Sequence, residues 1–134
     1  MVFNKEKLKV LIVDDSRIDL DILESILMQI GFEDVIKSES SKEALQLVRK
    51  HRPDLIISDI LMPELDGGMF RGLLKENPAT RDIPVIFISG IIAPQEETAY
   101  GGRLKSGDIL IAKPYSKDRI AEAIDVALKN TPKR

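Results

Sequence analysis

The chain has 134 residues, which at roughly 150 residues per domain predicts a single domain over residues 1–134, with a core of about 8 to 129 between short flexible ends. The hydrophobic share of 43% is enough to bury a core, and the count of 0 cysteines excludes disulfide frameworks and thiolate metal sites. Lys and Arg number 20 against 22 Asp and Glu, so the net charge of −2 lacks the basic excess expected of a protein that binds nucleic acid.

Five short apolar runs, rich in β-branched residues, alternate with amphipathic stretches along the chain. The runs are far shorter than the ~20 residues of a membrane span, and the N-terminus lacks the apolar stretch of a signal peptide. We therefore expect a cytoplasmic protein that does not bind membranes. The alternation predicts an α/β fold with repeated βα units around a mostly parallel sheet. The predicted strands are Val10–Val13, Val35–Ile36, Leu55–Ile57, Val85–Ile88 and Ile109–Ala112.

Helices are predicted between these strands from capping residues and from apolar residues at helical spacing. The first begins after the N-cap Ser16, which is followed three residues later by Asp19, and it ends at Gly31. In the segment 94–105, two adjacent glycines cost roughly 2 kcal/mol of helix propensity relative to alanine, so we expect any fourth helix there to be short or mobile. The other predicted helices run from Ser40 to before Pro53, from Asp66 to before Pro78, and from Ser116 to Lys129.

Acidic side chains directly follow two of the predicted strands. Asp14 and Asp15 come after the first strand and Asp59 ends the third, and ligands of a parallel α/β sheet bind where the carboxyl ends of its strands meet. Carboxylates that share such an edge raise one another's pKa values unless a cation compensates their charge. Mg²⁺ prefers oxygen ligands and commonly uses one or two carboxylates, whereas the chain offers no cysteine or histidine cluster for a softer metal. The sequence therefore predicts a Mg²⁺ site.

Two further polar residues are expected at the same edge. Ser89 follows the fourth predicted strand and Lys113 follows the fifth. A carboxylate beside Mg²⁺ can attack a phosphoryl group to form an aspartyl phosphate, while a lysine and a hydroxyl stabilise the transferred oxygens. This combination of residues predicts phosphoryl transfer to a carboxylate.

The order of these motifs closely resembles the receiver domain of two-component response regulators, over nearly the whole chain. The matching features are Asp14-Asp15, the stretch DILMPELDG from Asp59 to Gly67, Ser89, and Lys113-Pro114. The resemblance implies a single-domain, chemotaxis-type regulator. It also implies a flavodoxin-like (βα)5 fold, a doubly wound parallel sheet of five strands in the order 2-1-3-4-5.

The resemblance assigns roles around the expected metal. It implies that Asp59 is the phosphoacceptor and that Asp15 is a direct Mg²⁺ ligand. Asp14 would bind the metal through a water molecule, or would lie next to the direct ligands without touching the metal. The backbone carbonyl of Leu61 would be a further ligand. These roles make the chain a phosphorylated switch of a two-component pathway, or a member of a phosphorelay, rather than an enzyme.

The resemblance also assigns roles around the phosphoryl group. Ser89 and Lys113 would bind its oxygens, Gly90 would leave its approach open, and a cis peptide bond before Pro114 would orient the lysine. The donor is expected to be a histidine kinase or a phosphotransfer protein. The single histidine of the chain, His51, follows the second helix and is therefore predicted at the opposite edge of the sheet, away from the acceptor.

Two features depart from the family pattern: the residue at position 110, and the spacing of 24 from Ser89 to Lys113, which is about two residues longer than in compact relatives. Receivers usually place Tyr or Phe three residues before the lysine, where this chain has Leu110. An aliphatic side chain cannot repeat the aromatic rotation, so either the switch is read through backbone and loop movement or coupling is weak. We expect the fourth helix, fifth strand and fifth helix to form the face that contacts a downstream protein, with the glycine-rich segment absorbing the rearrangement.

Three alternative functions compete with the phosphorylated switch. A receiver-like interaction module that takes no phosphate has Leu110 as its only support. A phosphohydrolase of the haloacid dehalogenase-like kind needs an acid two residues after its nucleophile, where this chain has Leu61. An FMN carrier is disfavoured because Asp14 and Asp15 would repel the phosphate that such proteins bind in the first βα loop.

Overall fold

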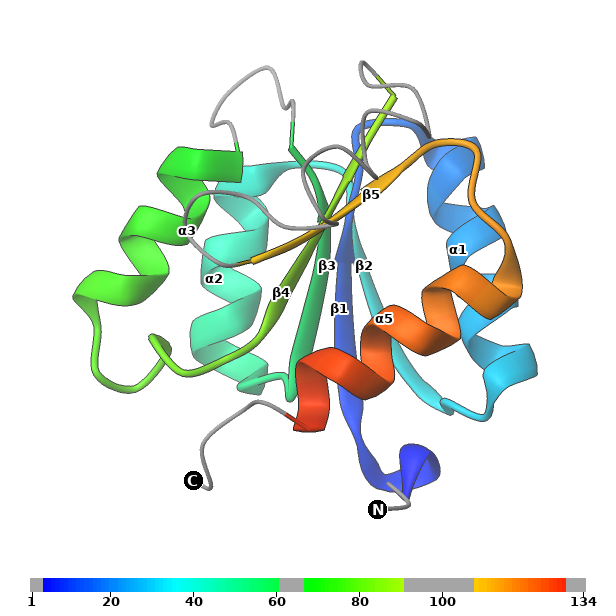
Figure 1. The fold of residues 1–134 in the computed structure, drawn as a ribbon. Helices are drawn as coiled ribbons and strands as arrows, with labels where there is room; N and C mark the ends of the chain where they lie inside the picture. The colour runs from blue at the N-terminus through cyan, green and yellow to red at the C-terminus, as the bar shows by residue number, and fades with distance from the viewer. Residues whose placement is uncertain (1–3, 61–66, 91–107, 130–134) are drawn as a thin grey trace.

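The computed structural model describes residues 4–60, 67–90 and 108–129. The strands of these residues form one five-stranded sheet in the order β2-β1-β3-β4-β5, and every neighbouring pair is parallel (Figure 1). The strands are β1 (Lys9–Val13), β2 (Asp34–Ser38), β3 (Leu55–Asp59), β4 (Val85–Ser89) and β5 (Ile109–Ala112). The predicted fold class and strand order are confirmed, and each predicted strand is present with ends that agree to within two residues.

The helices lie between the strands along the chain. They are a short 3-10 turn η1 (Lys5–Lys7) and the α-helices α1 (Arg17–Ile30), α2 (Ser41–His51), α3 (Gly67–Glu76) and α5 (Lys117–Lys129). The four α-helices agree with their predictions, whereas η1 was not predicted. The segment 94–105, where a short fourth helix was considered, and the ends at 1–3 and 130–134 lie outside the described residues. Among the described residues, none of the helices has the length and hydrophobicity needed to traverse a lipid bilayer.

The caps of α1 explain why this helix has its observed bounds. The Ser16 hydroxyl accepts a hydrogen bond from the backbone N–H of Asp19 at 3.3 Å, which satisfies one donor of the first turn. At the other end, Gly31 has a φ of 126°, a backbone conformation that residues other than glycine rarely adopt. Its N–H donates to the carbonyls of Leu27 and Met28. The helix therefore starts and stops where the sequence predicts.

Each face of the sheet carries its own apolar core. In β1, Val10 and Ile12 pack on the face covered by α1 and α5, whereas Leu11 and Val13 pack on the face covered by α2 and α3 (Figure 1). Leu110 of β5 is buried in this second core. Because the central strands are covered on both faces, they are continuous apolar runs, which is why the sequence reveals them clearly.

The strand register sets which residues meet at the carboxyl edge of the sheet. Val13 of β1 pairs with Ser58 of β3, so Asp14 and Asp59 follow at neighbouring positions. Ser89 at the end of β4 pairs with Ala112 at the end of β5. The loops that leave β1, β3, β4 and β5 therefore start from one edge.

Candidate functional site

Three carboxylates converge at the carboxyl edge of the sheet. Asp14, Asp15 and Asp59 each offer an oxygen, and these oxygens lie within 4.8 Å of one another. Asp14 and Asp15 directly follow β1, and Asp59 is the last residue of β3. The predicted convergence is therefore found, although the sequence separates Asp59 from the other two by the whole of β2 and α2.

Asp14 is the most deeply buried of the three. Its Oδ1 accepts a hydrogen bond from the backbone N–H of Ser16 at 2.9 Å, and its Oδ2 accepts one from Lys113. Burial raises the pKa of Asp14 above its usual range, and the nearby charge of Asp59 adds to the shift, although the hydrogen bonds from Ser16 and Lys113 oppose it. Asp14 is therefore a buried carboxylate whose charged form depends on these two hydrogen bonds.

Lys113 connects all of the site's strands. It directly follows β5, and its ammonium donates to Oδ2 of Asp14 at 2.9 Å, Oδ2 of Asp19 at 2.9 Å and Oδ2 of Asp59 at 3.1 Å. Burial lowers the pKa of Lys113, but these hydrogen bonds, led by the one to Asp19, outweigh burial and hold the pKa above its usual range. Lys113 is therefore a firmly charged ammonium surrounded by carboxylates.

The backbone of Lys113 is hydrogen-bonded to the end of the neighbouring strand β4. The N–H of Lys113 donates to the carbonyl of Ser89 at 2.9 Å, and the peptide bond between Lys113 and Pro114 is cis, as the resemblance implies. Ser89 is itself buried at the end of β4, beside the site. A Cβ built on Gly90 would lie 3.8 Å from Cδ of Lys113, which is an ordinary contact distance, so Gly90 borders the lysine directly.

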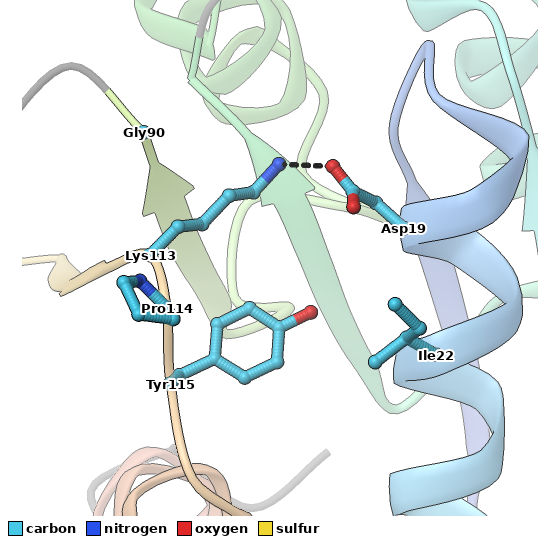
Figure 2. A pocket seen from close by; sticks show the side chains of 6 residues that line it. All are labelled: Asp19, Ile22, Gly90, Lys113, Pro114 and Tyr115. Atoms are coloured by element: carbon cyan, nitrogen blue, oxygen red, sulfur yellow. Dashed lines mark hydrogen bonds and ion pairs between the residues drawn. The ribbon is translucent and has the colours of Figure 1, made fainter.

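Asp19 is the site residue that the sequence prediction missed. It was interpreted only as part of the N-terminal cap of α1, and its backbone N–H does bind Ser16, but its carboxylate points across to Lys113 (Figure 2). The sequence carried no separate signal for this role, because acidic residues are common in the first turn of a helix.

A pocket of about 300 Å³ opens beside this contact, between α1 and the segment after β5. Figure 2 shows Tyr115 extending from that segment toward Ile22 of α1. Burial raises the pKa of Tyr115 to about 12. The residues that line the pocket are Asp19, Ile22, Gly90, Lys113, Pro114 and Tyr115.

Two other sequence predictions concern His51 and Leu61. His51 ends α2, and its carbonyl accepts a hydrogen bond from the side chain of Lys9 at the start of β1, so it lies at the opposite edge of the sheet, as predicted. Leu61, whose backbone carbonyl was predicted as a metal ligand, lies outside the described residues. So does the glycine-rich part of the expected output face.

The donor set fits a hard divalent cation. Asp14, Asp15 and Asp59 supply only carboxylate oxygens, and these are close enough to share one ion. The three carboxylates are grouped beside the ammonium of Lys113, the one cation whose ion pairs to Asp14 and Asp59 are seen among the described residues. A Mg²⁺ ion held by these residues would supply the missing positive charge, and it would also draw a bound phosphoryl oxygen toward Asp59.

Comparisons with known proteins agree with this geometry. The sequence model of the family described as "Response regulator receiver domain" matches residues 10–125. The chain is 34% identical over 117 residues to the polar-differentiation response regulator DivK of Brucella anthropi, which covers 86% of this chain and 91% of that protein.

Solved structures show the same relationship. A response regulator from Desulfuromonas acetoxidans superposes with a TM-score of 0.75 at 36% identity, covering 91% of this chain and 97% of that one. The signal receiver domain of a signal transduction histidine kinase from Syntrophus aciditrophicus superposes with a TM-score of 0.78 at 32% identity, covering 95% of this chain and 94% of that one.

Proposed function

The chain belongs to the response regulator receiver domain family of two-component signalling, and from this we propose that it is a switch in which Asp59 accepts a phosphoryl group in a Mg²⁺-dependent reaction. The observation that carries the proposal is the position of the Lys113 ammonium, 3.1 Å from Asp59 and 2.9 Å from Asp14, within one cluster of carboxylates. This arrangement supports a site in which Asp59 would act as the nucleophile, Lys113 as a fixed cation, and the carboxylate oxygens as metal ligands.

The proposed reaction transfers a phosphoryl group from a phosphorylated donor. A carboxylate oxygen of Asp59 attacks phosphorus, the bond from phosphorus to the donor breaks, and an acyl phosphate forms on Asp59 while the donor leaves with the bonding electrons. Asp14 and Asp15, together with Asp59, would hold the Mg²⁺ ion. The carbonyl of Leu61 stays a predicted further ligand.

Lys113 and Ser89 would stabilise the transferred group. The Lys113 ammonium is already directed at Asp59, so it can compensate the charge that builds up on the phosphoryl oxygens. Ser89 ends the neighbouring strand β4, where its hydroxyl would donate to another of these oxygens. Such positioned charges and donors supply most of the catalysis in phosphoryl transfer.

We propose a histidine kinase or a phosphotransfer protein as the donor, because His51 lies at the far edge of the sheet. Receiver domains interact with histidine kinases, and the matched DivK is itself a response regulator. The output would be contact with a downstream protein through the face that includes β5 and α5, in the cytoplasm. Leu110 is aliphatic and is buried in the core covered by α2 and α3, so it offers no aromatic ring for the readout and we infer that backbone movement carries it.

Phosphorylation by acetyl phosphate tests the proposal. In the presence of Mg²⁺, the intact mass of the wild type should rise by ~80 Da, and neither Asp59→Asn nor metal-free protein should show this gain. Asp82→Asn, which removes an exposed carboxylate outside the site, is the matched control and should gain the mass normally. No gain in the wild type would instead favour the interaction module that takes no phosphate.

A further inference from the structure

Asp19 binds the lysine of the site without belonging to the metal-binding cluster. Its Oδ2 lies 2.9 Å from Nζ of Lys113, as close as Oδ2 of Asp14. Among the described residues, the carboxylates grouped closely enough to share an ion are Asp14, Asp15 and Asp59, so Asp19 is a fourth acid with a separate position. It comes from the first turn of α1, which also forms one wall of the neighbouring pocket (Figure 2).

The hydrogen-bonding capacity of Lys113 is already used. An ammonium has three N–H donors, and those of Lys113 have three carboxylate partners, Asp14, Asp19 and Asp59. A phosphoryl group on Asp59 brings new oxygens that also need this donor. One of the three carboxylates must therefore lose its hydrogen bond to Lys113 when the phosphoryl group arrives.

Burial indicates which partner is released. The side chain of Asp19 is 37% exposed, whereas those of Asp14 and Asp59 are 9% and 13% exposed. A carboxylate that can be solvated by water loses little free energy when it leaves an ion pair, whereas leaving a buried carboxylate unpaired costs much more free energy. Asp19 is thus the partner that can let go with the least loss of free energy.

We propose that Asp19 competes with the phosphoryl group for Lys113, holding the ammonium toward α1 in the unphosphorylated protein and so slowing phosphorylation of Asp59. This inference rests on the function proposed above. Asp19 is a positioning residue in it, because it acts through Lys113 and not on the reacting atoms.

The direction of the effect follows from charge. Phosphodonors are anions, and the described residues of the site present four carboxylates, Asp14, Asp15, Asp19 and Asp59, against the ammonium of Lys113 and the Mg²⁺ ion proposed above. Replacing Asp19 by asparagine removes one repelling charge and frees one N–H of Lys113 for the incoming group. Both changes accelerate transfer.

The test is the initial rate of mass gain from acetyl phosphate at saturating Mg²⁺. Because the ion pair between Lys113 and Asp19 is partly exposed, Asp19→Asn should raise this rate about two- to fivefold. Asp19→Glu keeps the charge, and its rate should stay near that of the wild type. Asp21→Asn is the matched control, because Asp21 is an acid of the same helix whose ion pairs are with Arg17 and Lys37. It should leave the rate unchanged.

A second measurement uses the protein without metal or phosphodonor. Brief treatment with acetic anhydride, followed by peptide mass spectrometry, should modify Lys113 more in Asp19→Asn than in the wild type, with Asp21→Asn equal to the wild type. An unchanged or lower rate in Asp19→Asn, or unchanged labelling of Lys113, overturns the inference while the wild type still gains its phosphoryl group. A wild type that gains none overturns the proposed function as well.

Discussion

The ammonium of Lys113 lies 3.1 Å from Oδ2 of Asp59, although 54 residues separate the two in the chain. The parallel sheet brings them together, because β3 and β5 flank β4 and all three strands end at the same edge. The contact joins the proposed nucleophile, Asp59, to the ammonium of Lys113. Among the described residues, Lys113 is the one cation seen to form ion pairs with this carboxylate cluster. Removing either partner should therefore affect both chemistry and stability.

Replacing Lys113 by methionine should slow phosphorylation of Asp59 by about 100-fold, which is the usual effect of losing one preorganised donor to a developing anion. The rate of mass gain from acetyl phosphate in saturating Mg²⁺ measures it. Lys117→Met is the control, since Lys117 is an exposed lysine in the first turn of α5 and should react like the wild type. A Lys113→Met protein that reacts at the wild-type rate would contradict the proposed role.

Magnesium should stabilise the folded protein, because the ion compensates the carboxylates of Asp14, Asp15 and Asp59, which the unfolded chain does not hold together. The gain in the free energy of unfolding should reach about 2.7 kcal/mol when the ion is present at 100 times its dissociation constant. Thermal unfolding in MgCl₂, compared with NaCl of equal ionic strength, measures this gain.

The same measurement on variants locates the ion. Asp15→Asn should reduce the stabilisation by Mg²⁺, whereas Asp34→Asn, at an exposed residue that begins β2, should retain it. Equal shifts in MgCl₂ and NaCl for the wild type would show that the carboxylates do not hold the ion.

Alkaline pH should destabilise the protein through Tyr115. Burial raises the pKa of Tyr115 from 10.0 to about 12, so the folded protein keeps this proton over a range in which the unfolded chain loses it. The free energy of unfolding is therefore unaffected by this proton below pH 10, and it falls as the pH rises from 10 toward 12 because only the unfolded chain gives the proton up. Urea unfolding at pH 8, 10 and 11 should show a smaller loss for Tyr115→Phe than for the wild type.

Lys113 titrates in the same direction in both proteins, since its pKa is also raised above its usual value. The extra alkaline loss of the wild type over Tyr115→Phe therefore reports on the phenol together with its charge interaction with Lys113. Identical alkaline losses in the wild type and Tyr115→Phe would argue against a buried, neutral phenol at this position.

The core of α1 allows a matched pair of truncations. Leu27 is fully buried and Ile18 is 72% exposed, and both belong to this helix. Leu27→Ala should lower the free energy of unfolding by about 2 to 5 kcal/mol, whereas Ile18→Ala should change it by less than about 0.5 kcal/mol. Urea denaturation measures both, and similar losses for the two variants would mean that α1 packs differently.

The fold was largely predictable because its strands are buried on both faces. Ile56 and Ile57 face different cores, so β3 begins with the apolar run 55–57, which the sequence displays directly. The edge strand β2 was predicted too short, as Val35–Ile36, because its flanking Asp34 and Lys37 are polar and only pairing with β1 shows that they belong to the strand.

The site was predictable only where strand ends determine it. Asp14, Asp59 and Lys113 directly follow or end strands of one parallel sheet, so their meeting follows from topology. The contact of Asp19 with Lys113 depends on how α1 is rotated about its axis and joins residues 94 positions apart, and no local pattern encodes that. Leu61 and the expected fourth helix stay predictions.

The alternation of β1 also limits how this protein can change. Val10 and Ile12 belong to one core and Leu11 and Val13 to the other, and Asp14 follows directly. Inserting or deleting a single residue within β1 would exchange the two sets of side chains and rotate Asp14 away from its partners, even if every residue stayed apolar. Gene variants that alter the length of this strand should therefore be eliminated by selection, while substitutions among Val, Leu and Ile persist.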